Sequence, residues 1–370
     1  MLRISRMQRP TKMKTTEFRH NKFSEEAMPA FGMGTGRVRA SWHLPGFKKR
    51  LLILGTGELA VDLCHVIRSQ NWGLFHIVGF LDEKAERVGK RLVNPKIIGT
   101  YDQLTQIVEQ HHVDTIVVCM EDRRLFLPVQ SLLDFKAMGL NILDGHHLLE
   151  EASGRLSIDS LRPSALIFST GFRRRLGALV SKRLFDAVVS AVSLVLLIPF
   201  FALIAALIRV DSPGPVFYRQ VRVGLRGRPY MIWKFRSMRQ DAEKSGPQWA
   251  QANDSRVSRV GWWLRKTRID ELPQLVNVLK GEMSLVGPRP ERPVFVEELR
   301  KAIPYYDLRH TVRPGVTGWA QVRFRYGASQ EDAHSKLQYD LYYLKNLSFI
   351  LDMKILIRTI RVVMLGEGAH

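Results

Sequence analysis

Between residues 50 and 150, short apolar runs alternate with longer segments of helical periodicity. Four runs have the length and composition of strands: Arg50–Leu54, Phe75–Leu81, Thr115–Met120 and Leu140–Leu143. Three segments have the pattern of helices: the stretch from Ala60 to about Ser69, a region near Tyr101–His111, and another near Leu127–Met138. This alternation predicts an α/β module in which helices cover the faces of a parallel sheet.

The turn after the first predicted strand has the glycine spacing of a nucleotide-binding fold. Gly55-x-Gly57-x-x-Ala60 follows the strand directly, and Asp82 closes the second strand. In dinucleotide-binding folds such glycines let the backbone approach a phosphate, and the acidic residue binds the ribose. The spacing predicts a Rossmann-like fold more specifically than it predicts a ligand. We interpret the module as vestigial or regulatory, with Gly55 and Gly57 as candidate cofactor-binding residues.

A second pattern is the uninterrupted apolar run Ala187–Ile208, which follows a basic segment. As a helix it would be about 33 Å long, enough to cross a bilayer, although a buried core helix is the alternative. Pro199 lies near its middle and removes a backbone hydrogen bond. Positive residues prefer the cytoplasmic side of a membrane, and here they flank both ends of the run. A helix broken at Pro199 removes this conflict, so we predict a re-entrant membrane hairpin over residues 184–208.

The last apolar segment, Leu347–Leu365, also contains cations. Lys354, Arg358 and Arg361 interrupt its hydrophobic positions. This mixture predicts an amphipathic helix. Such a helix either lies on lipid or packs on the catalytic core, and the sequence leaves both alternatives open.

Composition adds a strong positive charge to these elements. The 370 residues include 56 Lys and Arg against 35 Asp and Glu, a net charge of +21, which indicates nucleic acid, anionic lipid or phosphorylated substrates as partners. Residues 1–49 are basic with little apolar periodicity, so we expect a disordered leader. The leader lacks the apolar core of a signal peptide, and Cys64 and Cys119 fit reduced thiols in the cytosol.

The candidate chemistry begins with two adjacent carboxylates, Asp270 and Glu271. Three cations precede them: Arg265, Lys266 and Arg268. We expect Asp270 to cap a short helix that Gly281 closes, and its pKa to be lowered by the helix dipole and the cations. Consecutive helical side chains diverge by roughly 100°, so one carboxylate could attack a substrate while the other holds a metal. A surface salt bridge at a helix N-cap is the alternative.

Several basic turns surround this pair in the sequence. Proline and glycine fix loops that can present arginine as a rigid, bidentate phosphate ligand. Together with the apolar run, the turns indicate phosphoryl transfer at a lipid interface. The turns are Asp211–Pro215, Tyr218–Gly224, Trp233–Met238, Gly287–Glu291 and Arg313–Gln321.

These motifs resemble, in order, those of the bacterial sugar transferases of the polyprenyl-phosphate glycosyl-1-phosphate transferase (monotopic phosphoglycosyl transferase) superfamily. The resemblance covers about half of the chain, from Lys182 to the C-terminus. The preceding α/β module resembles the nucleotide-binding-like module of the family's large members, and Tyr305–Trp319 is most similar to the exopolysaccharide-type members. The matching segments are Lys182–Asp186, Ser212–Phe217, Lys234–Met238, Thr267–Gln274, Ser284–Glu291 and Arg313–Trp319.

The resemblance implies a two-step reaction. Asp270 would attack the sugar-bearing phosphorus of a nucleotide-diphosphate sugar, and undecaprenyl phosphate would then capture the aspartyl phosphosugar, which initiates exopolysaccharide synthesis. Glu271 would hold Mg²⁺ as the metal ligand. The implied location is the bacterial inner membrane, with the catalytic domain in contact with lipid and facing the cytoplasm, and a homodimer is compatible with it. The residues expected to bind substrate phosphates are Lys234, Arg236, Arg265, Arg268 and Arg289.

The expected domain order has five parts. They are the leader 1–49, the Rossmann-like module 50–150, a linker with a basic helix over 151–183, the re-entrant helix 184–208, and a mainly α, α+β catalytic domain over 209–370 with its amphipathic C-terminal helix. Large family members usually carry spanning helices before the Rossmann-like module. We therefore expect either a start-site truncation or attachment by the hairpin and surface charge alone. Small members often place Ser before the hairpin proline, where this chain has Ile198.

Three other functions account for fewer of these features. An NAD-linked oxidoreductase explains residues 50–150 but leaves the hairpin and the basic turns without a purpose. A nucleic-acid-binding protein explains the charge but lacks a recognisable reading motif and does not need the apolar run, so we expect no nucleic-acid partner. A catalytically inactive membrane scaffold is disfavoured by the intact Asp270–Glu271 pair.

Overall fold

A computed structural model describes most of the chain after the basic leader. The described residues are 48–69, 75–120, 127–158, 171–172, 176–239, 254, 256–324 and 329–365. The predicted disorder of residues 1–49 falls almost wholly outside them and stays a prediction. The chain divides into two compact units, residues 1–148 (unit 1) and 149–370 (unit 2), and each is described by itself.

Unit 1 contains a five-stranded parallel sheet of Rossmann order. The strands run β3-β2-β1-β4-β5, so the chain reverses direction across the sheet after β3. The predicted parallel sheet is confirmed. The sequence analysis missed β3, whose four residues Ile-Ile-Gly-Thr include a glycine, a residue that is depleted in strands. The strands are β1 (Lys49–Leu54), β2 (Phe75–Asp82), β3 (Ile97–Thr100), β4 (Thr115–Val118) and β5 (Asn141–Asp144).

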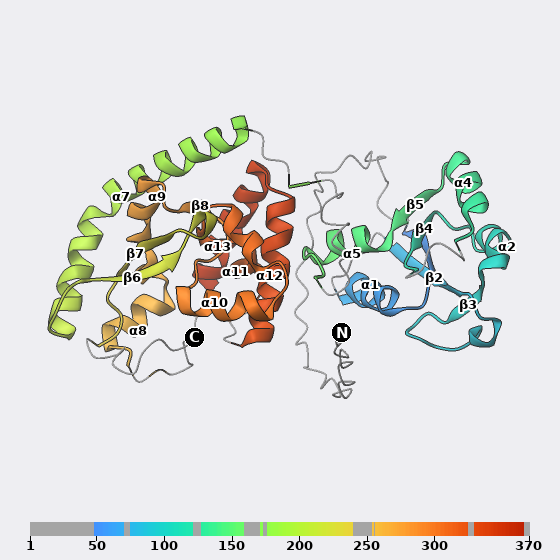
Figure 1. Cartoon of the computed structure of the whole chain (residues 1–370), viewed down its shortest axis with the longest axis horizontal. Coiled ribbons are helices and arrows are strands. Elements are labelled where there is room, and N and C mark those ends of the chain that lie inside the picture. The colour runs from blue at the N-terminus through green and yellow to red at the C-terminus, as the bar shows by residue number, and fades with distance from the viewer. Residues whose placement is uncertain are drawn as a thin grey trace, which may run out of the picture. The chain divides into compact units, whose positions relative to one another are not determined.

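Helices cover both faces of this sheet (Figure 1). On one face, Leu52 and Ile116 of the sheet pack against Phe135 of α4 and Leu104 of α2 in a continuous apolar core. Because both faces are covered, the central strands β1 and β4 are largely buried, as is typical of parallel sheets. The helical segments are α1 (Glu58–Ser69), η1 (Ala85–Arg87), η2 (Tyr101–Gln103), α2 (Leu104–Gln110), α4 (Val129–Ala137) and α5 (Gly145–Ser153).

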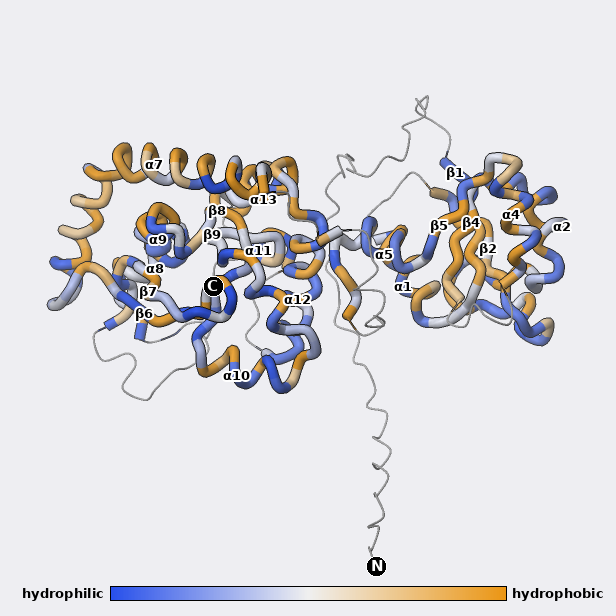
Figure 2. Tube along the Cα trace, turned by 45° about the horizontal axis from the view of Figure 1, so that its top comes forward, coloured by the Kyte–Doolittle hydropathy of each residue, from blue (hydrophilic) through white to orange (hydrophobic). Residues whose placement is uncertain are grey.

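The longest described helix of unit 2 is α7 (Leu176–Asp211), which has 36 residues and contains Pro199. Within the described part of the chain it is the one helix long and apolar enough to cross a membrane. The expected break at Pro199 is not observed, because the helix continues through the proline. Figures 1 and 2 show that it bends partway along its length instead. A proline removes one backbone hydrogen bond, and a helix can absorb that loss as a bend.

The rest of unit 2 is mainly helical with two small sheets. An antiparallel hairpin joins β6 (Phe217–Val223) to β7 (Pro229–Phe235), and β8 (Ser284–Val286) pairs in parallel with β9 (Gly315–Thr317). This confirms the expected mainly α, α+β domain. The helical segments are η3 (Leu225–Gly227), α8 (Arg259–Lys266), η4 (Ile269–Glu271), α9 (Gln274–Lys280), α10 (Pro293–Ala302), η5 (Tyr306–Thr311), α11 (Trp319–Arg323), α12 (Gln330–Lys345) and α13 (Phe349–Leu365).

The first part of α7 is fixed to the body of unit 2 by polar contacts. Arg183 donates hydrogen bonds to the carbonyls of Val278 (2.5 Å) and Leu279 (2.7 Å), which lie in the last turn of α9. A cation at a helix C-terminus satisfies carbonyls that have no partner within the helix. Lys182 forms an ion pair with the buried Asp352 of α13 at 2.7 Å. These contacts place the beginning of α7 beside α9 and α13.

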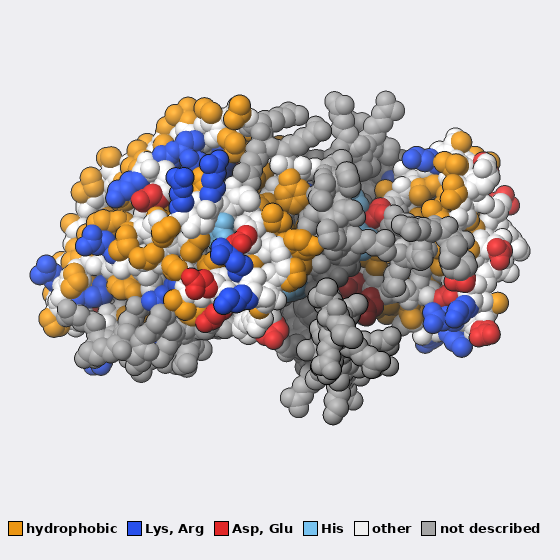
Figure 3. Space-filling view, in the orientation of Figure 1, with side chains coloured by type: hydrophobic (Ala, Val, Ile, Leu, Met, Phe, Trp, Pro, Cys, Tyr) orange, Lys and Arg blue, Asp and Glu red, His pale blue; other side chains and the backbone are white. Residues whose placement is uncertain are grey.

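The last part of α7 packs on the same unit through apolar contacts. Ile204 and Ile208 are buried against Phe235 of β7 and Leu264 of α8. Between the two anchored ends, the helix exposes large hydrophobic side chains, including Leu196 and Ile198. Figure 3 shows hydrophobic side chains gathered along this edge. An exposed apolar surface of this kind marks contact with a membrane or a partner.

The C-terminal helix α13 has two different faces. Ile355 is fully buried and Asp352 nearly so, which places one face on the core of unit 2. The opposite face exposes Ile350, Ile357 and Ile360. Figure 2 shows hydrophobic residues along both α13 and α7. Packing on the core therefore does not exclude contact with lipid, so the two alternatives expected for this helix are compatible.

Candidate active site

Asp270 and Glu271 lie in a 3₁₀ turn between α8 and α9. Arg268 precedes this turn with a left-handed backbone, φ 58°, which reverses the chain after α8. The expected N-cap role of Asp270 is wrong, because Asp270 lies inside η4 and Pro273 precedes α9. Gly281 ends α9 with φ 83°, as expected of a left-handed cap.

Glu271 is the residue on which the cations of the site converge. Its Oε1 lies 2.7 Å from Arg289, 3.1 Å from Lys234 and 4.0 Å from Arg268. Arg289 also donates to Oε2 at 3.3 Å, so its contact is bidentate. Burial would raise the pKa of Glu271, but Arg289 and Lys234 outweigh that effect and hold the pKa well below its usual range. Glu271 is therefore ionised at neutral pH.

Asp270 is buried beside Glu271 but does not share its partners. Its Oδ1 has no hydrogen-bond partner among the described residues, and the residue is only 7% exposed. Burial raises the pKa of Asp270 to about 6, with Glu271 adding to the rise and Lys234 and Arg268 opposing it. The expected lowering of this pKa is therefore wrong. A 3₁₀ turn of three residues supplies no sizeable helix dipole, and desolvation exceeds the attraction of the cations.

Three separate elements supply the cations around the pair. Lys234 comes from β7, Arg268 from the start of η4, and Arg289 from the loop after β8. Their side chains are 17%, 35% and 29% exposed, so each contacts Glu271 and still reaches solvent. Such groups can bind the phosphates of a ligand without a large rearrangement. The structure thus brings together three of the five residues that the sequence suggested for phosphate binding.

The other two candidates lie elsewhere. Arg236 is buried and donates to the carbonyls of Ser212 (2.5 Å) and Pro213 (3.0 Å), just after α7. Arg265 lies on α8, close enough to Asp254 to add a small share to the lowering of its pKa, which is caused mainly by hydrogen bonds from Arg256. Alternate residues of a strand point to the same face, which would place Lys234 and Arg236 together. However, β7 ends at Phe235, so this rule does not extend to Arg236. We therefore leave Arg236 and Arg265 out of the proposed phosphate-binding set.

Asn277 holds β7 and α9 together, a role that the sequence analysis missed. Its amide accepts from the backbone of Trp233 at 3.0 Å and donates to Glu282 (2.7 Å) and to the carbonyl of Met231 (2.7 Å). Asn277 is fully buried, and these bonds place Lys234 next to Glu271. The sequence did offer one signal for this role: the amide of Asn277 stands next to the apolar Val278 in a predicted helix. An amide buried there without hydrogen bonds would cost folding free energy, so it needs polar partners.

Three glycines bring the Arg289 loop against β9. A Cβ on Gly315 would lie 2.1 Å from the backbone nitrogen of Gly287, and a Cβ on Gly318 would lie 2.2 Å from the carbonyl oxygen of Gly287. No other residue fits such a close approach of two backbones. This contact explains why the Gly-Pro-Arg-Pro-Glu segment and the Pro-Gly-Val-Thr-Gly segment occur together in one chain.

The pair fits a magnesium ion only together with a phosphate ligand. Within the described ranges, no group of three or more His, Cys, Asp or Glu residues could hold a metal ion. Mg²⁺ commonly takes one or two carboxylates and completes its shell with water and substrate phosphate, which Glu271 and Asp270 could provide for. Three cations already surround Glu271, so a divalent ion there needs the negative charge of phosphates beside it.

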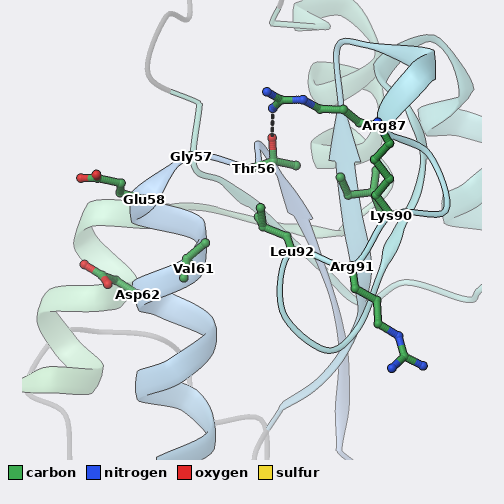
Figure 4. Close-up of a pocket in the computed structure, with 10 residues that line it drawn as sticks. Thr56, Gly57, Glu58, Val61, Asp62, Arg87, Lys90, Arg91 and Leu92 are labelled. Atoms are coloured by element: carbon green, nitrogen blue, oxygen red, sulfur yellow. Dashed lines mark hydrogen bonds between the residues drawn. The ribbon is translucent and has the colours of Figure 1, made fainter. Parts of the chain in front are cut away.

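The glycine turn of unit 1 borders a cavity of about 810 Å³ (Figure 4). Asp82 accepts hydrogen bonds from the Thr56 hydroxyl, the Lys84 backbone (2.8 Å) and Arg87 (3.3 Å). The carboxylate that would bind a ribose is thus engaged by the protein itself, which disfavours the NAD-linked alternative. Figure 4 shows Arg87 bonded to Thr56 at this cavity. Gly55 packs against the end of β4, where an added Cβ would lie 2.8 Å from the Cys119 carbonyl.

Comparison with known families assigns the chain to a family. A sequence model described as a bacterial sugar transferase matches residues 177–366, just over half of the chain, and the chain therefore belongs to this family. A second model, described as a CoA-binding domain, matches residues 33–125, which include the glycine turn.

Curated relatives carry related transferase names. A UDP-N-acetylgalactosamine-undecaprenyl-phosphate N-acetylgalactosaminephosphotransferase of Aeromonas hydrophila is 45% identical over 60% of this chain and 52% of its own. A UDP-glucose:undecaprenyl-phosphate glucose-1-phosphate transferase of Escherichia coli is 34% identical over 90% of this chain and 72% of its own. The exopolysaccharide production protein PSS of Rhizobium leguminosarum is 44% identical over 49% and 94%. The chain thus spans about half the length of the Aeromonas protein.

The position of Arg236 predicts a structural role. Arg236→Gln should lower the free energy of unfolding by about 2 kcal/mol, because it leaves buried carbonyls unpaired. Arg228→Gln, at an exposed position of the same hairpin, should change it by less than about 0.5 kcal/mol. Denaturant unfolding of the purified chain measures both values. If Arg236→Gln left the free energy of unfolding unchanged but abolished phosphate binding, the structural role would be wrong and Arg236 would belong to the phosphate-binding set.

Proposed function

We propose that the chain transfers a sugar 1-phosphate from a nucleotide-diphosphate sugar to undecaprenyl phosphate and so initiates exopolysaccharide synthesis. The observation that carries this proposal is the asymmetry of the carboxylate pair. Glu271 is held by three cations, whereas the adjacent Asp270 has a buried oxygen without a hydrogen bond. The names of the relatives support a UDP-sugar as the donor.

Asp270 is the proposed nucleophile. In its ionised form, an oxygen of Asp270 attacks the phosphorus that bears the sugar, and the bond from that phosphorus to the bridging oxygen breaks. The nucleoside monophosphate leaves with the bonding electrons. An oxygen of undecaprenyl phosphate then attacks the aspartyl phosphosugar and releases the Asp270 carboxylate. A poorly solvated carboxylate suits this role, because fewer hydrogen bonds need to be broken when it reacts.

The surrounding side chains have distinct proposed tasks. Lys234, Arg268 and Arg289 bind the diphosphate and stabilise the charge that develops on the departing phosphate. Glu271 orients these cations and, with phosphate oxygens, would hold Mg²⁺. When bound, the metal would supply further neutralisation of the phosphate charge.

The proposed membrane arrangement follows from the two anchored ends of α7. Arg183 near one end and Ile208 near the other both contact the body of unit 2. A straight span would separate these ends by the thickness of the bilayer, which would divide unit 2 between two compartments. We therefore propose that α7 enters and leaves on the cytoplasmic face of the inner membrane. This arrangement lets the lipid tail stay in the bilayer while its phosphate reaches Asp270.

Replacing the nucleophile tests the proposed reaction. Asp270→Asn preserves shape but removes the attacking charge, so transfer should fall by about 1,000-fold or more. Asp307→Asn, at an exposed carboxylate of unit 2, is the matched control and should retain activity. The measurement is transfer of labelled sugar phosphate from UDP-glucose and UDP-N-acetylgalactosamine to undecaprenyl phosphate in membranes, with Mg²⁺ present. Full activity in Asp270→Asn would refute the assignment of the nucleophile.

The pKa of Asp270 predicts the acid limit of activity. Protonation below about pH 6 removes the nucleophilic form, so kcat/KM should fall about tenfold per pH unit below that value. Glu271→Gln removes a negative charge that raises the pKa of Asp270. The acid limit of the variant's residual activity should therefore lie at a lower pH than that of the wild type. A pH profile of both proteins measures this shift. A wild-type limit near pH 4, the value of an ordinary Asp, would contradict the burial argument.

Cysteine labelling tests the membrane arrangement. Gly177→Cys lies in the first turn of α7, before its apolar run, and Arg219→Cys lies after the end of α7. Both positions are exposed, whereas the native Cys64 and Cys119 are fully buried. With an impermeant maleimide, both thiols should react in inside-out vesicles and neither in right-side-out vesicles. Labelling of the two positions from opposite faces would show a simple span instead.

A further inference from the structure

The loop that carries Arg289 is fixed along its whole length. The amide of Gly287 donates to the Thr317 carbonyl at 2.9 Å, and the carbonyl of Pro288 accepts from Gly315 at 2.9 Å. Further on, the Pro290 carbonyl accepts from Arg222 at 3.1 Å and that of Glu291 from the Val223 amide at 2.9 Å. The backbone carbonyl of Arg289 is bound by a side chain from a different part of unit 2.

That side chain is Arg309 of η5. It is 7% exposed, and its guanidinium reaches three groups from three elements. One nitrogen donates to the Tyr306 hydroxyl at 2.6 Å. The other donates to the Arg289 carbonyl at 2.9 Å and forms an ion pair with Asp340 of α12 at 2.9 Å. Arg309 thus joins η5, α12 and the Arg289 loop at one point.

The charge of Arg309 is retained although the side chain is buried. Burial alone would lower the pKa of Arg309, but Tyr306 and Asp340 outweigh it and raise the pKa above its usual value. A buried cation of this kind is costly unless its hydrogen bonds and its counter-ion are all in place. The guanidinium is planar and offers several donors in a fixed fork, so these partners fix its orientation.

We propose that Arg309 is a positioning residue for the reaction. It holds the backbone of Arg289 so that the Arg289 guanidinium meets Glu271 in the bidentate geometry observed at 2.7 and 3.3 Å. This inference rests on the proposed function only in that Arg289 acts on the substrate phosphates. Lysine cannot replace Arg309, because one ammonium nitrogen cannot span the same three partners in a fixed plane.

A double-mutant cycle tests whether Arg309 acts through Arg289. Arg309→Lys keeps the positive charge but loses the fork, and kcat/KM for transfer should fall about 10- to 100-fold, as on loss of other supporting hydrogen bonds around a site. In an Arg289→Ala background, the same change should cost less than about 3-fold, because its target is already absent. The fall in kcat/KM of Arg309→Lys should come from kcat and from KM in the same proportion as the fall measured in Arg289→Lys. Equal losses in both backgrounds would overturn the proposal.

Two further measurements separate positioning from folding. Arg300→Lys, at an exposed arginine of the adjacent α10 that pairs with Asp307, is the matched control and should keep wild-type activity. Asp340→Asn removes the counter-ion without changing shape and should reproduce the Arg309→Lys pattern in weaker form. If wild type itself shows no transfer, the proposed function fails, and hydrogen exchange of residues 284–292 still tests the inference. Exchange there should rise in Arg309→Lys, and unchanged exchange would contradict it.

Discussion

Two adjacent carboxylates buried in one turn cannot both remain charged unless nearby cations compensate them. In this protein the compensation is unequal. Glu271 takes Lys234 and Arg289 as close partners, and its pKa is held well below normal, whereas burial raises the pKa of Asp270 to about 6. Glu271 is therefore an ionised group that holds the cations, whereas Asp270 has an oxygen without a hydrogen bond. The proposed chemistry depends on this separation.

The fold serves this turn from several directions. Asn277 ties α9 to β7, which brings Lys234 to Glu271, and close glycine contacts bring the Arg289 loop beside β9. Both anchored parts of α7 contact the same body, the first through α9 and the last through α8. The site is therefore built where the proposed membrane helix joins the catalytic unit. A polyprenyl phosphate held in the lipid would meet the carboxylate pair there without leaving the bilayer.

Periodicity and glycine spacing were sufficient to predict the parallel sheet of unit 1. The apolar run was predicted as a helix, but not its continuity through Pro199, and the mixed catalytic unit was implied by the family resemblance. The motifs also brought Lys234, Arg268 and Arg289 into one predicted site. Local sequence could not show that Arg236 closes the end of α7, since that role depends on carbonyls more than twenty residues away. It also could not give the pKa of Asp270, because desolvation depends on tertiary packing.

The central claim is that the oxygen of Asp270 makes a transient bond to phosphorus, and isolation of that intermediate tests it most directly. The purified protein would be mixed with a UDP-sugar in the absence of undecaprenyl phosphate, quenched in acid, digested and analysed by mass spectrometry. The account predicts a phosphosugar adduct on Asp270 that disappears when undecaprenyl phosphate is added. An adduct on another residue, or none while transfer proceeds at its normal rate, would contradict the account.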